Sequence, residues 1–135
     1  MPGHALLAPI PKMHLDSALA VLSKKAFVCF ASDTWEPFKT LEMGSKIYIY
    51  VSHAEEESAV RYEGVFCGIV TEPVEMKKLE KEGFRPATTV GEKCGLFWKV
   101  REINPLSRPL PLSSIQLASG KYLKSYPRGP LQVVS

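Results

Sequence analysis

The chain has 135 residues, enough for one domain, and its hydrophobic content of 45% can supply a core without disulfides or metal ions. No apolar run approaches the roughly 18 residues that span a membrane, and the first residues lack the pattern of a secretion signal, so we expect one cytoplasmic domain over residues 1–135 with no membrane contact. The formal net charge of +3 is too small to predict a nucleic-acid partner by itself.

The N-terminal quarter predicts a strand, a helix and a second strand. Residues 4–10 are apolar up to two prolines, which end a strand. Apolar residues at helical spacing then predict a helix over 17–25, with Asp16 as its N-cap and a lysine pair at its C-terminus. Residues 26–31 are apolar at every position, which is the pattern of a central strand covered on both faces.

A polar connection and a hairpin follow. Residues 32–45 predict a connection that places Trp35 and Phe38 near the surface or over the mouth of a barrel. Residues 46–52 alternate, so that one face of the strand is apolar and the other carries Tyr48, Tyr50 and Ser52. After an acidic loop, residues 61–74 predict the second strand of the hairpin, and Gly64 and Gly68 within it permit bulges or bends.

The second half of the chain predicts a short exposed helix and two more strands. Its segments are a helix over 75–82, a loop over 83–95, a strand over 96–103, a proline-punctuated turn with one helical turn near Pro111, and a strand over 130–134. Trp98 is in phase with apolar neighbours and is predicted to be core. The whole pattern predicts a mostly β (α+β) domain, a closed or nearly closed barrel decorated by short helices.

The cysteines and histidines give no support for a metal or a cofactor. Cys29, Cys67 and Cys94 are isolated among apolar residues, so we expect three buried, reduced thiols. The three histidines fall in separate segments without the spacing of metal ligands.

Several short motifs in this order resemble the PUA-like superfamily. They are LAPIPKMHLDSAL near the N-terminus, a lysine-bearing helix end, G-x-K-I-Y-I-Y-V-S from Gly44, G-V-F-C-G-I-V from Gly64, and F-W-K-V followed by R-P-L-P-L. The ASCH type is the branch most similar, EVE-type domains are neighbours, and an uncharacterised archaeal family of that superfamily is a further candidate. The resemblance implies a small PUA-like β-barrel that binds RNA, or modified bases in nucleic acid, in a cleft between barrel and helices.

The resemblance does not extend to a catalytic motif. ASCH domains usually carry G-x-K at the helix end, followed by a Glu and an Arg, whereas this chain reads Leu22-Ser23-Lys24-Lys25 and then AFVCFAS. Only a lysine is retained, and the following strand offers no carboxylate as general acid or base. We therefore identify no catalytic residue from the sequence.

The C-terminal quarter holds the most suggestive candidate site. Glu102 is the last acidic residue, so four bases beyond it are not offset by any acid. Bases and tyrosines interleave here as Lys121, Tyr122, Lys124, Tyr126 and Arg128, a combination that can neutralise phosphates and stack on bases. A solvated basic loop with tyrosines packed on the barrel is the alternative.

Further candidates for nucleic-acid contact lie on the helix end, the connection and the hairpin strand. Trp35 can stack on a base or pack as a lid, and Lys39 lies on the same connection. Lys24 and Lys25 can contact phosphate or serve as ordinary charges at a helix C-terminus. Tyr48 and Ser52 lie on the polar face of their strand and are candidates to line a cleft.

We favour an RNA-binding module with a basic, aromatic-lined cleft for an unpaired or modified base. A small hydrolase acting on modified nucleosides, with Lys24 or Lys25 as its active amine, is the first alternative. A protein-interaction module using apolar residues of the C-terminal segment is the second. No G-x-S-x-G, phosphate-binding glycine loop or HExxH motif supports an enzyme.

Overall fold

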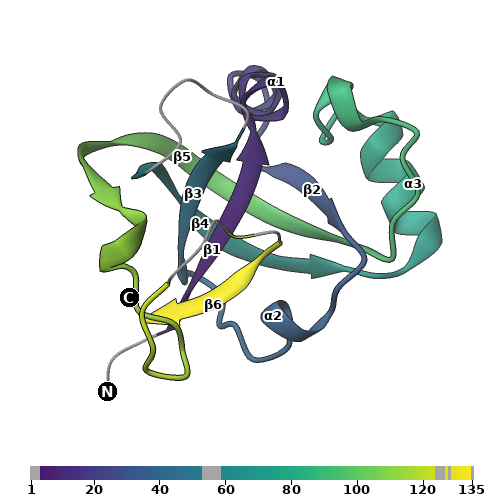
Figure 1. The fold of residues 1–135 in the computed structure, drawn as a ribbon. Helices are drawn as coiled ribbons and strands as arrows, with labels where there is room; N and C mark the ends of the chain where they lie inside the picture. The colour runs from purple at the N-terminus through teal and green to yellow at the C-terminus, as the bar shows by residue number, and fades with distance from the viewer. Residues whose placement is uncertain (1–3, 53–58, 124–126, 128, 135) are drawn as a thin grey trace.

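In a computed structural model that describes residues 4–52, 59–123, 127 and 129–134, the chain forms one coiled sheet with helices around it (Figure 1). The described residues contribute six strands to this sheet, in the order β2-β5-β4-β3-β1-β6. The elements are β1 (His4–Pro11), α1 (Lys12–Leu22), β2 (Val28–Ser32), α2 (Glu36–Lys39), β3 (Lys46–Ser52), β4 (Ala59–Val70), α3 (Pro73–Lys81), the 3-10 helix η1 (Ala87–Thr89), β5 (Leu96–Pro111), the 3-10 helix η2 (Leu112–Ser114) and β6 (Leu131–Val134). The predicted α+β class is therefore confirmed.

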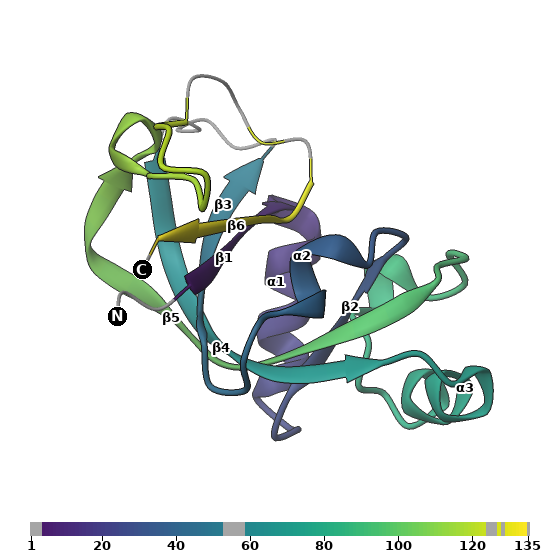
Figure 2. The ribbon, with the colours of Figure 1, turned by 90° about the horizontal axis from the view of Figure 1, so that it is seen from below.

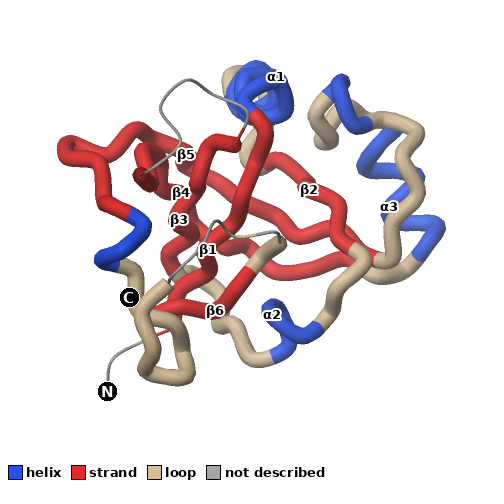
Figure 3. The backbone as a smooth tube through the Cα atoms, viewed as in Figure 1, coloured by secondary structure: helices blue, strands red, loops and turns tan. Residues whose placement is uncertain are grey.

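The sheet is almost a barrel, and α2 bridges its opening. β2 and β6 are the two ends of the strand order. α2 follows β2 directly in the chain, and the side chain of Gln132 on β6 donates to the carbonyl of Pro37 at 3.0 Å and to the hydroxyl of Thr40 at 2.8 Å. Figure 1 shows α1 at one end of the coiled sheet and α2 at the other, and Figure 3 shows the helices in blue around the red strands.

Three apolar clusters hold the fold together. The largest lies inside the coiled sheet and includes Ile47, Ile49 and Val51, as the alternation of this strand predicted. A second cluster lies on the other face of β1 and β3 under the C-terminal segment, and a third lies under α3. Tyr50, on the face of β3 predicted to be polar, is only 2% exposed because η2 and β6 cover it in the second cluster.

The first helix begins earlier than predicted. It runs from Lys12 to Leu22 with Pro11 as N-cap, instead of starting after Asp16. Asp16 lies inside the helix and pairs with Lys12 at 2.9 Å, one turn before it. Proline has a fixed φ that suits the entry to a helix, so Pro11, the last residue of β1, leads directly into α1. Pro9, which was also predicted to end the strand, lies within it and pairs with Tyr50 of β3.

The prediction that the second strand is central was wrong. β2 is a terminal strand of the sheet, and its apolar side chains are buried on both faces for another reason. On one face it joins the inner cluster, and on the other it joins the cluster under α3. The amide of Cys29 also donates to the carbonyl of Phe84 at 2.8 Å, so a loop segment covers part of the open edge.

β5 continues to Pro111, eight residues beyond the predicted end at Ile103. β2 pairs only with Leu96–Val100 of β5, so the rest of β5 has a partner on one side alone. A strand of this kind tolerates prolines, because one row of its amides need not donate to a neighbour. The predicted helical turn near Pro111 is η2.

The two glycines of β4 lie at irregularities of its pairing with β5. Register shifts fall between Glu63 and Val65 and between Phe66 and Ile69, as the glycines predicted. Gly68 has φ of +105°, and a Cβ added at Gly64 would lie 2.7 Å from a methyl group of Val100. Both positions therefore require glycine, one for its backbone and the other for space.

Candidate nucleic-acid interface and adjoining pocket

Trp35 is held at the surface by the short helix that follows it. Phe38, one turn later, is buried and packs on Trp98 with ring centroids 5.5 Å apart and on Phe66 at 6.4 Å. The amide of Phe38 donates to the carbonyl of Trp35 at 3.0 Å, so the buried ring fixes the start of the helix. Trp35 itself stays 49% exposed, and Lys39 at the end of α2 is exposed as well.

Lys121 and Tyr122 lie on a small hairpin that extends the sheet beyond β6. The amide of Leu117 donates to the carbonyl of Lys121 at 2.7 Å, and the amide of Leu123 donates to the carbonyl of Ile115 at 2.9 Å. The first arm of this hairpin pairs with β6 through a bridge between Leu117 and Val133. Lys121 is exposed, and the Tyr122 side chain is 57% exposed.

Gln132 joins the segment of Trp35 to the segment of Tyr122. Its side chain donates to α2, and its carbonyl accepts from the amide of Ala118 in the hairpin at 3.2 Å. Figure 2 shows α2 beside β6, with the C-terminal segment on the far side of that strand. The structure therefore places two separately predicted segments, around Trp35 and around Lys121, on either side of β6, where Gln132 contacts both.

The two segments differ in charge. Residues 32–43 carry three acidic residues and only Lys39, whereas no acid follows Glu102 in the chain. Neither Lys39 nor Lys121 forms an ion pair with any residue that the structure describes. By composition, the C-terminal segment is therefore the more basic of the two.

Lys24 and Lys25 lie away from this surface, in the turn after α1, because the helix ends at Leu22 and does not reach the lysine pair as predicted. Lys24 is exposed, and the Lys25 ammonium group lies 5.0 Å from the centroid of the Phe84 ring. Phe84 stacks on Phe27 at 4.5 Å, and the Lys99 ammonium group lies 5.2 Å from the centroid of Phe27. The structure does not bring these two candidate lysines together with Trp35, because α1 and α2 lie at opposite ends of the coiled sheet in Figure 1.

The remaining candidates lie along β3 or outside the described residues. Tyr48 is half-buried and packs on the second cluster, which also includes Leu117 and Leu123 of the hairpin. Ser52 is half-buried at the end of β3. Three further candidates lie outside the described residues, namely Lys124, Tyr126 and Arg128.

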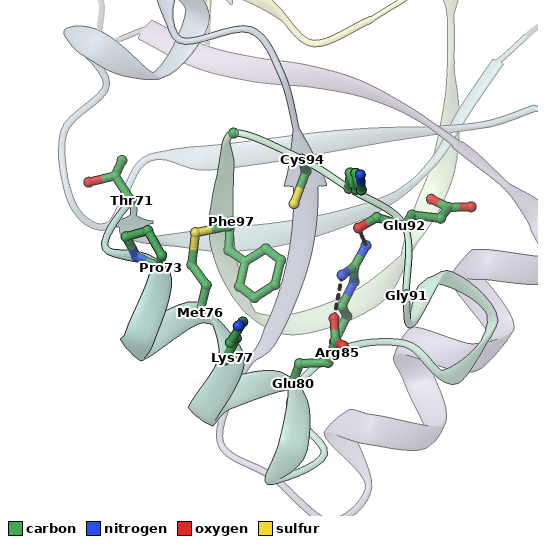
Figure 4. A pocket seen from close by; sticks show the side chains of 12 residues that line it. Thr71, Pro73, Met76, Lys77, Glu80, Arg85, Gly91, Glu92, Cys94 and Phe97 are labelled. Carbon is green, nitrogen blue, oxygen red and sulfur yellow. Dashed lines mark hydrogen bonds and ion pairs between the residues drawn. The ribbon is translucent and has the colours of Figure 1, made fainter.

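An open pocket of about 420 Å³, which the local sequence patterns did not predict, lies between α3 and the loop over residues 85–95 (Figure 4). Arg85 forms part of its wall, with a side chain that is only 2% exposed. Its guanidinium group pairs with Glu80, donates to the hydroxyl of Thr89 at 3.1 Å and donates to the carbonyl of Glu92 at 3.0 Å. It also lies 5.1 Å from the centroid of the Phe97 ring.

One signal in the sequence pointed to Arg85. It stands between Phe84 and Pro86 in a stretch that was interpreted only as a loop. An arginine between two apolar residues is a candidate for burial with a carboxylate partner, since burial of a charge requires pairing. The partner, Glu80, lies five residues earlier on the helix that was predicted to be exposed.

The cysteines differ in exposure from the prediction. Cys29 is fully buried, and this burial raises the pKa of its thiol to about 12. Cys67 and Cys94 are only half-buried, so the prediction of three buried thiols was wrong for these two. Cys67 lies at an irregularity of β4, and Cys94 lies on the wall of the pocket, where burial still raises the pKa of its thiol.

Within the described ranges, no group of three or more His, Cys, Asp or Glu side chains lies close enough to hold a metal ion. In the same part of the chain, no helix combines the length and apolar character needed to cross a membrane.

The comparisons with known proteins identify the fold but no family. No protein-family model matches the chain, and no curated protein matches its sequence. The fold is similar to the crystal structure of ASCH from Zymomonas mobilis, with a TM-score of 0.50 and 17% sequence identity. The matched region covers 92% of this chain and 85% of that chain. The chain therefore has an α+β fold similar to that of this ASCH structure.

Proposed function

We propose that the protein binds single-stranded or locally unpaired RNA on the surface formed by α2 and the hairpin over residues 115–123. One observation carries this proposal. Among the described residues, the large hydrophobic side chains that are exposed include two aromatic ones, Trp35 and Tyr122, and they lie on the two segments that Gln132 joins. Exposed aromatic rings beside unpaired lysines have the chemistry of a binding site for single strands.

The charges of the two segments suggest a division of roles. The acidic residues around α2 disfavour phosphate, so Trp35 stacks on a base while Lys121 and the other bases of the C-terminal segment hold the backbone. An unpaired or modified base is the target, because a base inside a duplex cannot stack on an exposed ring.

No specific observation on the described residues favours the alternative function, a small hydrolase with Lys24 or Lys25 as its active amine. Within the described residues, neither Lys24 nor Lys25 pairs with a carboxylate, and the ammonium group of Lys25 faces an aromatic ring. We therefore propose RNA binding and not hydrolysis.

Replacing Trp35 with alanine is expected to weaken binding of a single-stranded RNA by about 1–3 kcal/mol, because one stacked base loses its partner. The salt dependence of binding should not change, since no charge is removed. Fluorescence anisotropy with a labelled oligonucleotide at several salt concentrations measures both quantities. Met13→Ala is the control, because Met13 is also largely exposed but lies on α1. An unchanged affinity of the folded Trp35→Ala variant would exclude a stacking role.

Replacing Lys121 with alanine is expected to act on the salt dependence instead. Each lost phosphate contact with a single strand lowers the slope of the logarithm of the binding constant against that of the salt concentration by about 0.7. Replacing Lys121, Lys124 and Arg128 together is expected to lower it by about 2. Lys24→Ala, at an exposed lysine at the opposite end of the coiled sheet, should leave the slope unchanged. A salt slope in the triple variant equal to that of the wild-type protein would contradict the electrostatic part of the proposal.

A further inference from the structure

The pocket between α3 and the loop over residues 85–95 has no part in the proposed RNA surface, although the two adjoin. The amide of Gly95 at its rim donates to the carboxylate of Asp33 at 3.0 Å, two residues before Trp35. The pocket volume of about 420 Å³ falls within the range of about 300–1,000 Å³ that is usual for small-molecule sites.

The inner end of this pocket is apolar and is not filled by α3. None of the residues of α3 is fully buried, and the helix meets the sheet only through half-buried side chains such as Met76. Met76, Cys94 and Phe97 belong to the third apolar cluster and line the pocket together. In Figure 4 these three side chains surround one space. These thioether, thiol and aromatic groups are favourable neighbours for an apolar ring.

The wall opposite α3 is held in place by Arg85. Its three hydrogen bonds reach α3 through Glu80, η1 through Thr89, and the loop through the carbonyl of Glu92. The two walls are therefore tied together before any ligand arrives. A preformed site of this kind avoids the entropic cost of ordering a loop on binding.

Three charged side chains that line the pocket form no ion pair within the described residues, namely Lys77, Lys93 and Glu92, and the carboxylate of Asp33 lies at the rim. Lys77 on α3 and Lys93 on the loop are exposed, and neither forms an ion pair within the described residues. Glu80 is paired with Arg85, and in Figure 4 the Glu92 side chain extends away from Phe97. An anionic group on a ligand would thus find two ammonium groups at the mouth of the pocket.

We propose that this pocket binds a small aromatic anion, a planar ring that carries one phosphate or carboxylate group. The ring lies against Phe97, Met76 and Cys94, and the anion lies between Lys77 and Lys93. A nucleoside monophosphate and an aromatic carboxylic acid share this chemistry, and the experiment below distinguishes them.

Cys94 reports on occupancy of the pocket, and Cys67 serves as a control in the same molecule. Cys67 is also half-buried but lies outside the pocket lining. The full chain is alkylated with iodoacetamide at alkaline pH, because the thiolate is the reactive form and burial raises the pKa of Cys94. The probes are adenosine 5′-monophosphate and indole-3-acetate, each compared with its uncharged counterpart, adenosine or indole. Mass spectrometry measures the rate at each cysteine.

At least one anion is expected to slow the alkylation of Cys94 at millimolar concentration and to leave Cys67 unchanged. Its uncharged counterpart should require about tenfold higher concentration, since a factor of ten corresponds to about 1.4 kcal/mol, a modest charge-assisted contact. Protection by the nucleotide alone would identify a phosphate-bearing ligand such as a nucleoside monophosphate. Protection by indole-3-acetate alone would identify an aromatic carboxylic acid. Absence of protection by either anion, or equal protection by the uncharged compounds, would overturn the proposal.

Variants at the mouth of the pocket test whether the two lysines bind the anion. Replacing both Lys77 and Lys93 with alanine is expected to raise the half-protecting concentration of the anion about tenfold or more. Lys78→Ala is the matched control, because Lys78 is the neighbouring lysine of α3 and lines a different groove on its other flank. An equal effect of Lys78→Ala would show that general charge, and not this pocket, attracts the anion. Trp35→Ala should leave the protection unchanged, so failure of RNA binding and failure of this proposal are distinguishable.

Discussion

Replacing Arg85 with alanine is expected to lower the free energy of unfolding by about 3 kcal/mol, the lower end of the range for breaking a buried ion pair. The Arg85 side chain is 2% exposed, but the Glu80 side chain is 31% exposed, so water can solvate part of the charge that remains. The hydroxyl of Thr89 and the carbonyl of Glu92 also lose a donor, and Thr89 is itself buried.

Urea unfolding followed by circular dichroism measures this change. Arg101→Ala is the control, because the pair of Arg101 with Glu102 is exposed on both sides and is expected to contribute less than about 1 kcal/mol. A variant at Arg85 that is as stable as the one at Arg101 would show that the buried network does not hold the loop. Arg85→Lys should recover only part of the loss, since one ammonium group cannot reproduce a planar fork with three partners.

Periodicity was sufficient where one face of a strand is buried along its whole length. The strand over 46–52 has the predicted bounds because its alternation places Ile47, Ile49 and Val51 in one cluster without exception. Trp98, in phase with its neighbours, is core as predicted. The glycines of β4 indicated the bulges, because their effect on the backbone is local.

Tertiary context explains the errors. An all-apolar segment such as 26–31 is equally consistent with a central strand and with a terminal strand covered by a helix, and only the strand pairing in the assembled sheet shows that β2 is terminal. The prolines of β5 predict a break in a central strand, yet they are tolerated where the strand has one neighbour. Whether a neighbour is present is a property of the assembled sheet.

The candidate site was predictable in its chemistry but not in its assembly. Exposed aromatic and basic residues around Trp35 and Lys121 were identified from local composition, and their proximity depends on Gln132, a polar residue in an apolar strand. The pocket at Arg85 was missed because its walls come from two segments that look solvated when each is considered alone.

Replacing Phe38 with alanine is expected to lower the free energy of unfolding by about 3–5 kcal/mol, as for other buried phenylalanines. The ring packs on Trp98 and Phe66 at the end of the inner cluster, next to the opening of the sheet that α2 bridges. Its removal leaves a cavity there and loosens the helix that presents Trp35. Under conditions where the variant stays folded, its affinity for single-stranded RNA should therefore fall as well, with an unchanged salt slope.

The comparison of Phe38→Ala with Trp35→Ala separates support from contact on the same short helix. Trp35→Ala should weaken RNA binding and leave stability within about 0.5 kcal/mol, because an exposed side chain contributes little to folding. Phe38→Leu, which keeps most of the buried volume, should restore both stability and affinity if Phe38 only supports the helix. If Phe38→Leu were stable but still failed to bind RNA, the Phe38 ring itself would contact the ligand, and the binding surface would extend into the opening of the sheet.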